Sequence, residues 1–261
     1  VAAFNVNPAN WTPFLPFGWG GVISGAALIF FAYIGFDAVS TAAEEAVNPP
    51  RDLPIGILAS LVVCTGIYIL VAGLLTGIVP YTTLNVASPV ADALLRLGHQ
   101  SAAAFIAAGA IAGLTTVMLV LYYGLTRVFL AMSRDGLLPP VFSAVHQRTH
   151  TPIRVILASG VLIAAIAGFT PIGDVAELVN IGTLAAFVLV CGGVIVLRYT
   201  KPDLPRPFKT PFSPLVPLLG IAFCVYLMIS LPAITWERFA IWLALGMAVY
   251  FGYSRKRSVL A

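Results

Sequence analysis

The sequence predicts an all-α fold, a polytopic membrane helix bundle. Its 261 residues are 60% hydrophobic and only 9% charged, whereas a soluble domain has roughly a quarter charged residues. The mean hydropathy is +0.99, and the apolar residues fall into runs of roughly 17 to 27, the length of a helix that crosses a bilayer. Within lipid each backbone amide must find its partner inside its own element, so these runs predict helices.

Seven membrane spans are expected, and prolines mark several of their ends. The predicted spans are 20–46, 53–79, 102–132, 153–169, 175–199, 215–231 and 239–253. The prolines that separate them are Pro49, Pro50 and Pro54 after the first span, Pro80 after the second, and Pro139, Pro140 and Pro152 before the fourth. Segment 86–98 is too polar and short to cross the membrane, so we expect an external surface helix there, either part of a lid or inert.

Basic residues give the expected orientation, because Lys and Arg collect on the cytoplasmic side of membrane proteins. Only Arg96 and Arg238 lie at the opposite set of ends. The other twelve of the 14 are Arg51, Arg127, Arg134, Arg148, Arg154, Arg198, Lys201, Arg206, Lys209, Arg255, Lys256 and Arg257. The C-terminus is therefore expected in the cytoplasm and Val1 outside. Because no targeting segment precedes the first span, we expect 1–261 to be a single transmembrane domain fragment of a longer protein, with missing N-terminal helices.

The first span carries a carboxylate about two thirds of the way along. Asp37 follows Gly35 in "YIGFDA" (33–38), and glycine leaves helical geometry at the lowest cost. We therefore predict an unwound hinge between an outer half-helix, 20–31, and an inner half-helix that begins near Asp37 and is capped by its side chain. Exposed backbone at this depth is tolerated where it lines a cavity. The alternative is a continuous helix in which Asp37 pairs with a buried residue of another helix.

Four stretches have a recognisable pattern: "FFAYIGFDAVSTAAEEAVNPPRDLPIGI" (30–57), "SRDGLLPPVFSAVH" (133–146), "THTPIR" (149–154) and "YTKPDLPRPFKTPFSPLVPLLG" (199–220). They resemble bacterial amino acid permeases of the cationic amino acid transporter family, in the amino acid–polyamine–organocation (APC) superfamily. The resemblance implies helices six to twelve of that family. These would form the second inverted repeat of a LeuT-like transporter fold (20–199) plus two trailing helices (213–254), multi-pass in the bacterial inner membrane.

The resemblance also implies a substrate site at the broken helix, between helices one and six of the family. We expect the carbonyls of Phe31, Ala32 and Ile34, beside Gly35, to accept hydrogen bonds from a substrate ammonium, with the Phe31 ring covering it. A helix C-terminus has unpaired carbonyls and partial negative charge, which suits this role.

Further polar residues are candidates for coupling and gating. Asp37 is a candidate for proton coupling or for capping, because a poorly solvated carboxylate has raised proton affinity. Glu44 and Glu45 are a candidate inner gate or a solvated interfacial pair. Thr115 and Thr116 form a candidate cation site, by resemblance to sodium-coupled transporters, or simply bond to their own backbone.

These observations predict a secondary active transporter of amino acids, proton-coupled (or using sodium), that works by alternating access. The alternatives are a carrier of polyamines or other organic cations, or a membrane channel or structural subunit. Enzyme function lacks support, because no catalytic set or phosphate loop occurs. No cofactor, metal or nucleic-acid partner is expected. The three cysteines, Cys64, Cys191 and Cys224, lie within apolar runs without a motif, so we expect small core residues.

Overall fold

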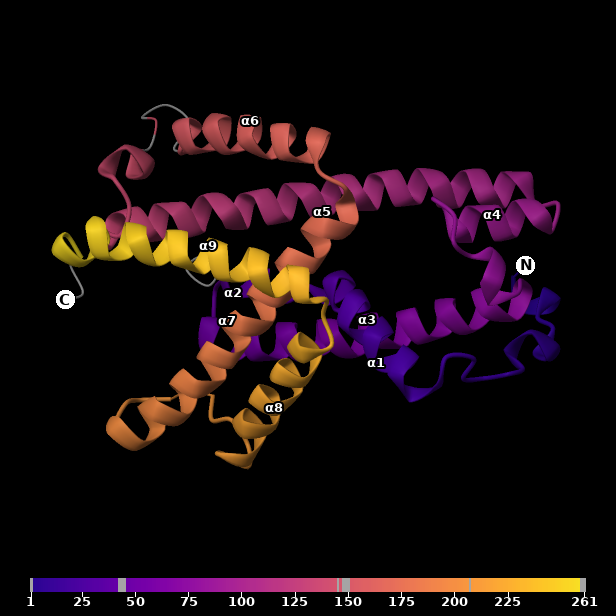
Figure 1. Ribbon diagram of the computed structural model, residues 1–261, viewed down its shortest axis with the longest axis horizontal. Coiled ribbons are helices and arrows are strands. Elements are labelled where there is room, and N and C mark those ends of the chain that lie inside the picture. Colours follow the sequence, from indigo (N-terminus) through magenta and orange to yellow (C-terminus); the bar gives the residue numbers. More distant parts are fainter. Residues whose placement is uncertain (1, 42–45, 145, 147–150, 207, 259–261) are drawn as a thin grey trace.

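The computed structural model describes residues 2–41, 46–144, 146, 151–206 and 208–258, and within them it contains helices and no strand. The described residues form nine α-helices, whose arrangement Figure 1 shows. They are α1 Gly18–Tyr33, α2 Ala38–Thr41, α3 Pro49–Ile78, α4 Pro89–Arg96, α5 Gln100–Arg134, α6 Ile153–Phe169, α7 Ile172–Thr200, α8 Leu215–Ile229 and α9 Ala233–Gly252. Short 3₁₀ turns are η1 Ala2–Asn5, η2 Pro8–Trp11, η4 Tyr81–Thr83, η5 Pro140–Ser143 and η6 Ser254–Lys256. The prediction of an all-α membrane bundle is confirmed.

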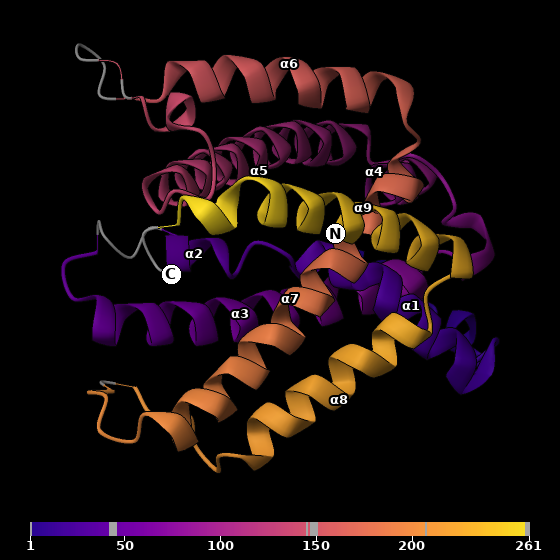
Figure 2. The same ribbon diagram turned by 60° about the vertical axis from the view of Figure 1, so that its left-hand side comes forward.

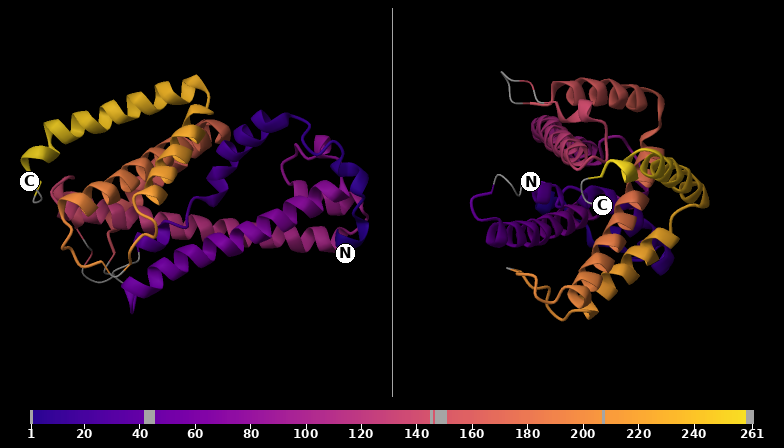
Figure 3. Two further views of the ribbon diagram at one scale, coloured as in Figure 1. Left: turned by 90° about the horizontal axis from the view of Figure 1, so that it is seen from below. Right: turned by 90° about the vertical axis from the view of Figure 1, so that its left-hand side faces the viewer.

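Helices α3 and α5 are the longest elements, with 30 and 35 residues, and they run along the length of the molecule (Figure 1). Helix α7 packs against α8 and also contacts α1 and α9. The pair α7 and α8 crosses the direction of α3 obliquely (Figure 2). Helix α6 lies beside α5 at one edge of the bundle, as the right-hand view of Figure 3 shows.

Within the described residues, three helices, α3, α5 and α7, are long and apolar enough to cross a membrane alone. Helices α8 and α9 are long and apolar enough only when they are taken together, as a pair bent by 115°. Helices α1 and α6 are apolar but shorter. The number of single long helices is thus smaller than the seven predicted spans. At 1.5 Å per residue, the 16 residues of α1 span roughly 24 Å, against about 30 Å of hydrocarbon.

Two helix starts differ from the predicted ones by four or more residues. Helix α3 begins at Pro49 rather than at residue 53, because proline fits the first turn of a helix, where the backbone N–H has no partner anyway. Helix α9 begins at Ala233 rather than at residue 239. Arg238 therefore lies inside the helix, and its guanidinium forms an ion pair of 3.1 Å with Asp174 on α7.

Most apolar side chains on the long helices face outward. Val62 on α3 and Phe105 on α5 are 72% and 80% exposed. Water would penalise such surfaces at roughly 25 cal/mol per Å², whereas lipid does not. The buried core is correspondingly small, and it joins α1, α7 and α8 through Ala27, Ile181, Leu184, Met228 and Leu231.

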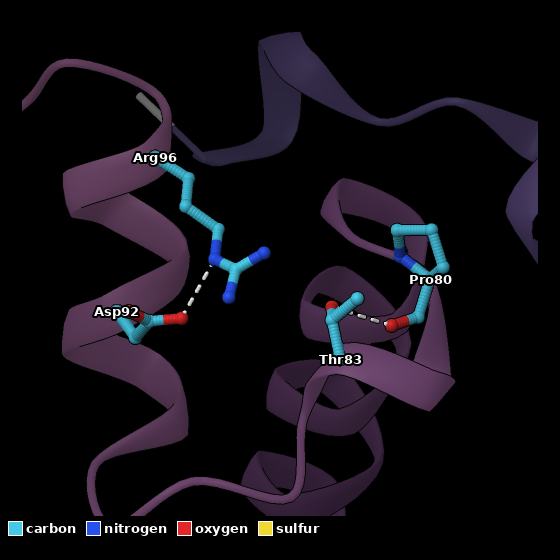
Figure 4. Close-up of polar contacts among 4 residues, drawn as sticks. All are labelled: Pro80, Thr83, Asp92 and Arg96. Carbon is cyan, nitrogen blue, oxygen red and sulfur yellow. Dashed lines mark hydrogen bonds and ion pairs between the residues drawn. The ribbon is translucent and has the colours of Figure 1, made fainter.

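The connection between α3 and α5 contains the predicted surface helix, α4. Figure 4 shows its Asp92–Arg96 ion pair, 2.7 Å long, beside the Thr83 hydroxyl, which donates to the Pro80 carbonyl. The helix is amphipathic, with Leu94 buried against the molecule and the ion pair outside. The predicted helix is thus confirmed, and a lid role stays a prediction.

Candidate substrate site

The first apolar segment is interrupted, as predicted. Helix α1 ends at Tyr33 and α2 begins at Ala38. Between them Gly35 has φ of +124°, a conformation that L residues rarely adopt. The outer half-helix ends at Tyr33 rather than at Phe31 as expected, and the Ile34 amide closes its last turn by donating to the Phe31 carbonyl.

Asp37 lies inside the interruption and is half-buried. Its Oδ1 accepts a hydrogen bond of 3.0 Å from the Gly35 amide, while its own carbonyl accepts from the amide and hydroxyl of Ser40. The carboxylate thus stabilises the bent backbone two residues before it. The prediction was a cap on the amides that follow Asp37, at the start of the inner half-helix, whereas the bond described here comes from an amide that precedes it. A role in proton coupling stays a prediction.

A cavity of about 320 Å³ lies where the interruption meets α3 and α5. From the interruption it is lined by residues 32–36, from α3 by Ser60, Leu61, Cys64 and Tyr68, and from α5 by Thr116, Val117, Val120 and Leu121. No charged side chain is among these described lining residues. Its polar groups are backbone carbonyls, hydroxyls and one thiol, so it suits a neutral side chain.

Tyr68 connects α3 to the end of the outer half-helix. Its hydroxyl donates to the Ala32 carbonyl at 3.0 Å, and its ring meets the Tyr33 ring edge-on, with centroids 5.0 Å apart. The carbonyl expected to hold a substrate ammonium therefore already has one donor. A carbonyl has two lone pairs, so a second donor can share it.

The structure brings only some of the predicted site residues together. Ala32, Ile34, Gly35 and Thr116 line the cavity. Phe31 is not among the residues that line the cavity, and 43% of its surface is exposed.

Thr115 also lies outside the lining set. The hydroxyls of Thr115 and Thr116 donate to the Ile111 and Ala112 carbonyls of their own helix, at 2.8 and 2.7 Å, as the alternative predicted. Glu44 and Glu45 lie outside the described residues.

The α3 wall of the cavity was not predicted from the sequence. Ser60, Cys64 and Tyr68 are spaced four residues apart, so they occupy one face of the helix, and that spacing was the available signal. The expectation that Cys64 is a core residue was wrong, because it is exposed toward the cavity. Among the described residues no cluster of three side chains could ligate a metal ion.

Buried polar contacts position the outer half-helix. Asn180 on α7 is 0% exposed, and its Nδ2 donates to the carbonyls of Ala27 and Leu28 on α1. Nearer the start of α7, α9 is held by the Thr235 hydroxyl, which donates to Glu177 at 2.6 Å, and by the ion pair of Arg238 with Asp174. Helix α7 thus anchors both α1 and α9.

Comparison with known proteins places the chain in a family. The model of the family described as "Amino acid permease" matches residues 1–250. A methylthioribose transporter of Bacillus subtilis is 51% identical over 98% of this chain and 55% of its own length. The branched-chain amino acid permease BcaP of the same organism is 51% identical over 100% of this chain and 56% of its own.

A vacuolar cationic amino acid transporter 4 of Arabidopsis thaliana is 44% identical over 73% of this chain and 32% of its own length. The chain spans about half the length of the two Bacillus relatives, whose names describe transporters. The predicted resemblance is confirmed, and with a family model that covers 250 of its residues the chain belongs to the amino acid permease family.

Proposed function

We propose that this chain forms the second repeat (20–199) and the two trailing helices (213–254) of a secondary active amino acid transporter. The interruption at Gly35 carries the proposal, because it places the carbonyl end of α1 in a cavity. Discontinuous helices in membranes use such ends to hold substrates. The names of the relatives, amino acid permease among them, support this class of function.

In this proposal the substrate ammonium binds the carbonyls of Ala32 and Ile34, and its side chain lies against Cys64 and Val120. The apolar lining favours a neutral, aliphatic amino acid over a cationic one, because a charge moved into an apolar site without a partner loses several kcal/mol of solvation. A branched-chain amino acid fits this description, which also agrees with the name of one relative.

We further propose coupling to protons, with Asp37 as the exchanging group. Its position beside Gly35 links its charge to the geometry of the interruption. Protonation of the carboxylate weakens its bond with the Gly35 amide, since an ionised acceptor forms the stronger hydrogen bond. Sodium at Thr115 and Thr116 has less support, because both hydroxyls donate to their own helix.

Alternating access follows if α1 and α2 pivot about Gly35. Glu44 and Glu45, which fall outside the described residues, remain our proposed inner gate.

We also propose a bacterial inner-membrane location with a cytoplasmic C-terminus, because twelve of the 14 Lys and Arg residues fall on one side of the predicted topology. Green fluorescent protein fused after Ala261 is expected to fluoresce, and alkaline phosphatase fused at the same place is expected to be inactive. The reverse pattern refutes the orientation.

Uptake into proteoliposomes tests the proposed function. With the complete gene product that contains these residues, we expect saturable leucine uptake that rises with an external acid pulse and shows counterflow. Arginine and putrescine are expected to compete poorly. Asp37→Asn is expected to keep leucine counterflow but lose most of the acceleration by the pulse.

Vesicles that contain only residues 1–261 are the matched control, and we expect no accumulation in them. Uptake that does not saturate points to a channel and contradicts the proposal. Preference for arginine or putrescine contradicts the proposed substrate class, and full acceleration in Asp37→Asn contradicts the coupling role.

A further inference from the structure

A groove of about 370 Å³ lies between the C-terminal parts of α5 and α9, away from the substrate cavity. Both helices end on the same side of the molecule (Figures 1 and 2). On α9 the lining residues include Trp242, Gly246 and Tyr250, and just after α5 they include Leu137 and Leu138. The lining is thus mainly apolar.

The groove has the length of one leaflet of a bilayer. Trp242, Gly246 and Tyr250 are four residues apart and therefore share one face of α9. The lining continues to Ser254, just past the end of α9 at Gly252. The ten residue steps from Trp242 to Gly252 at 1.5 Å each span roughly 15 Å, about half of a 30 Å hydrocarbon core. No atom lies within 4 Å of a Cβ placed on Gly246, so this position leaves open space where an acyl chain fits.

The mouth of the groove, at Ser254, is held by two close contacts. The Ser254 hydroxyl, on a residue only 4% exposed, donates to the Leu137 carbonyl at 2.7 Å. Gly136 lies so close to the Arg257 carbonyl that no side chain fits between them. These two contacts hold the segment after α9 against the end of α5 and fix the groove's mouth.

Four exposed cations lie next to this end in the chain: Arg134 is the last residue of α5, and Arg255, Lys256 and Arg257 directly follow the lining residue Ser254. Asp135 is the single acidic residue next to them in the sequence. The ion pairs described in this structure lie elsewhere, at Asp92–Arg96 and Asp174–Arg238. In the described part of the chain, then, these cations have no carboxylate partner, and the Arg257 guanidinium stacks on the Tyr253 ring.

We propose that this groove binds an anionic phospholipid of the cytoplasmic leaflet, with one acyl chain along Gly246 and the phosphate at Arg255, Lys256 and Arg257. Cations collect on the cytoplasmic side of any membrane protein. Here, however, they border an apolar groove one leaflet long, and basic pockets between membrane helices recognise such headgroups. The site rests on the proposed orientation of the C-terminus and is independent of the transported substrate.

Native mass spectrometry of the purified chain, titrated with phosphatidylglycerol or phosphatidylcholine, tests the site. We expect phosphatidylglycerol to bind about tenfold more tightly. R255Q/K256Q/R257Q is expected to bring its affinity down to that of phosphatidylcholine. Gly246→Leu, which fills the groove, is expected to lower the affinity for both lipids.

Matched controls separate the groove from general effects. R154Q/K201Q/K209Q removes three exposed cations of the same predicted side, and Gly168→Leu adds a side chain to an open position on α6. Both are expected to bind phosphatidylglycerol like the unaltered chain.

Three outcomes overturn the proposal. The first is equal affinity of the unaltered chain for both lipids. The second is equal loss in the two triple variants. The third is absence of selective binding in the complete gene product, which would show that another segment of the polypeptide covers the groove.

Discussion

Replacing Gly35 by alanine is expected to lower the initial rate of leucine uptake by the complete gene product about tenfold or more. The φ of +124° at this position is accessible almost only to glycine, and a residue held in such a conformation costs roughly 1–3 kcal/mol. No atom lies within 4 Å of a Cβ placed there, so the effect comes from the backbone rather than from a clash. The strain disfavours the bent connection and thus the open carbonyls of α1.

Two helical glycines provide matched controls for this substitution. Gly66 on α3 and Gly113 on α5 also have open space at the Cβ position and no positive φ. Alanine at either site is expected to leave uptake unchanged and to stabilise the helix by up to about 1 kcal/mol. Normal uptake by Gly35→Ala, at equal expression and melting temperature, would show that transport does not need this backbone conformation.

Replacing Asn180 by alanine is expected to lower the free energy of unfolding by about 2 kcal/mol, measured by thermal or denaturant unfolding of the chain in detergent. Asn180 is 0% exposed and donates to two carbonyls of α1, at 3.0 and 3.3 Å. Its loss removes both bonds and leaves a cavity between α1 and α7. Asn180→Leu retains the volume, so we expect it to lose less stability than the alanine variant.

Ser60→Ala is the matched control for the buried amide. The Ser60 hydroxyl donates only to the Ile57 carbonyl of its own helix, so its removal breaks no contact between helices. We expect a change below about 0.5 kcal/mol. If Asn180→Ala is no less stable than Ser60→Ala, the amide does not hold α1 against α7.

The interruption of the first helix was predictable because its cause is local. A glycine and an aspartate two residues apart in an apolar run favour a bend, and the structure has one between Tyr33 and Ala38. The start of α9 was not predictable. Arg238 resembled a span boundary, yet its charge is neutralised by Asp174, which lies 64 residues earlier in the chain.

The candidate site was predictable only on the side of the interruption. The opposite wall depends on how α3 and α5 pack, and the bond from Tyr68 to Ala32 joins residues 36 positions apart. A single sequence carries no direct signal for such a pairing. The same limit applied to Thr116, because its place in the cavity depends on helix packing, whereas its bond to Ala112 follows from helical geometry.

The most direct test of the central claim is an experimental structure of the complete gene product with leucine bound. We expect the chain to leave helical geometry at Gly35 and the leucine nitrogen to lie within about 3.2 Å of the carbonyl oxygen of Ala32 or Ile34. A continuous helix through residues 33–38, or leucine bound away from these carbonyls, would contradict the account.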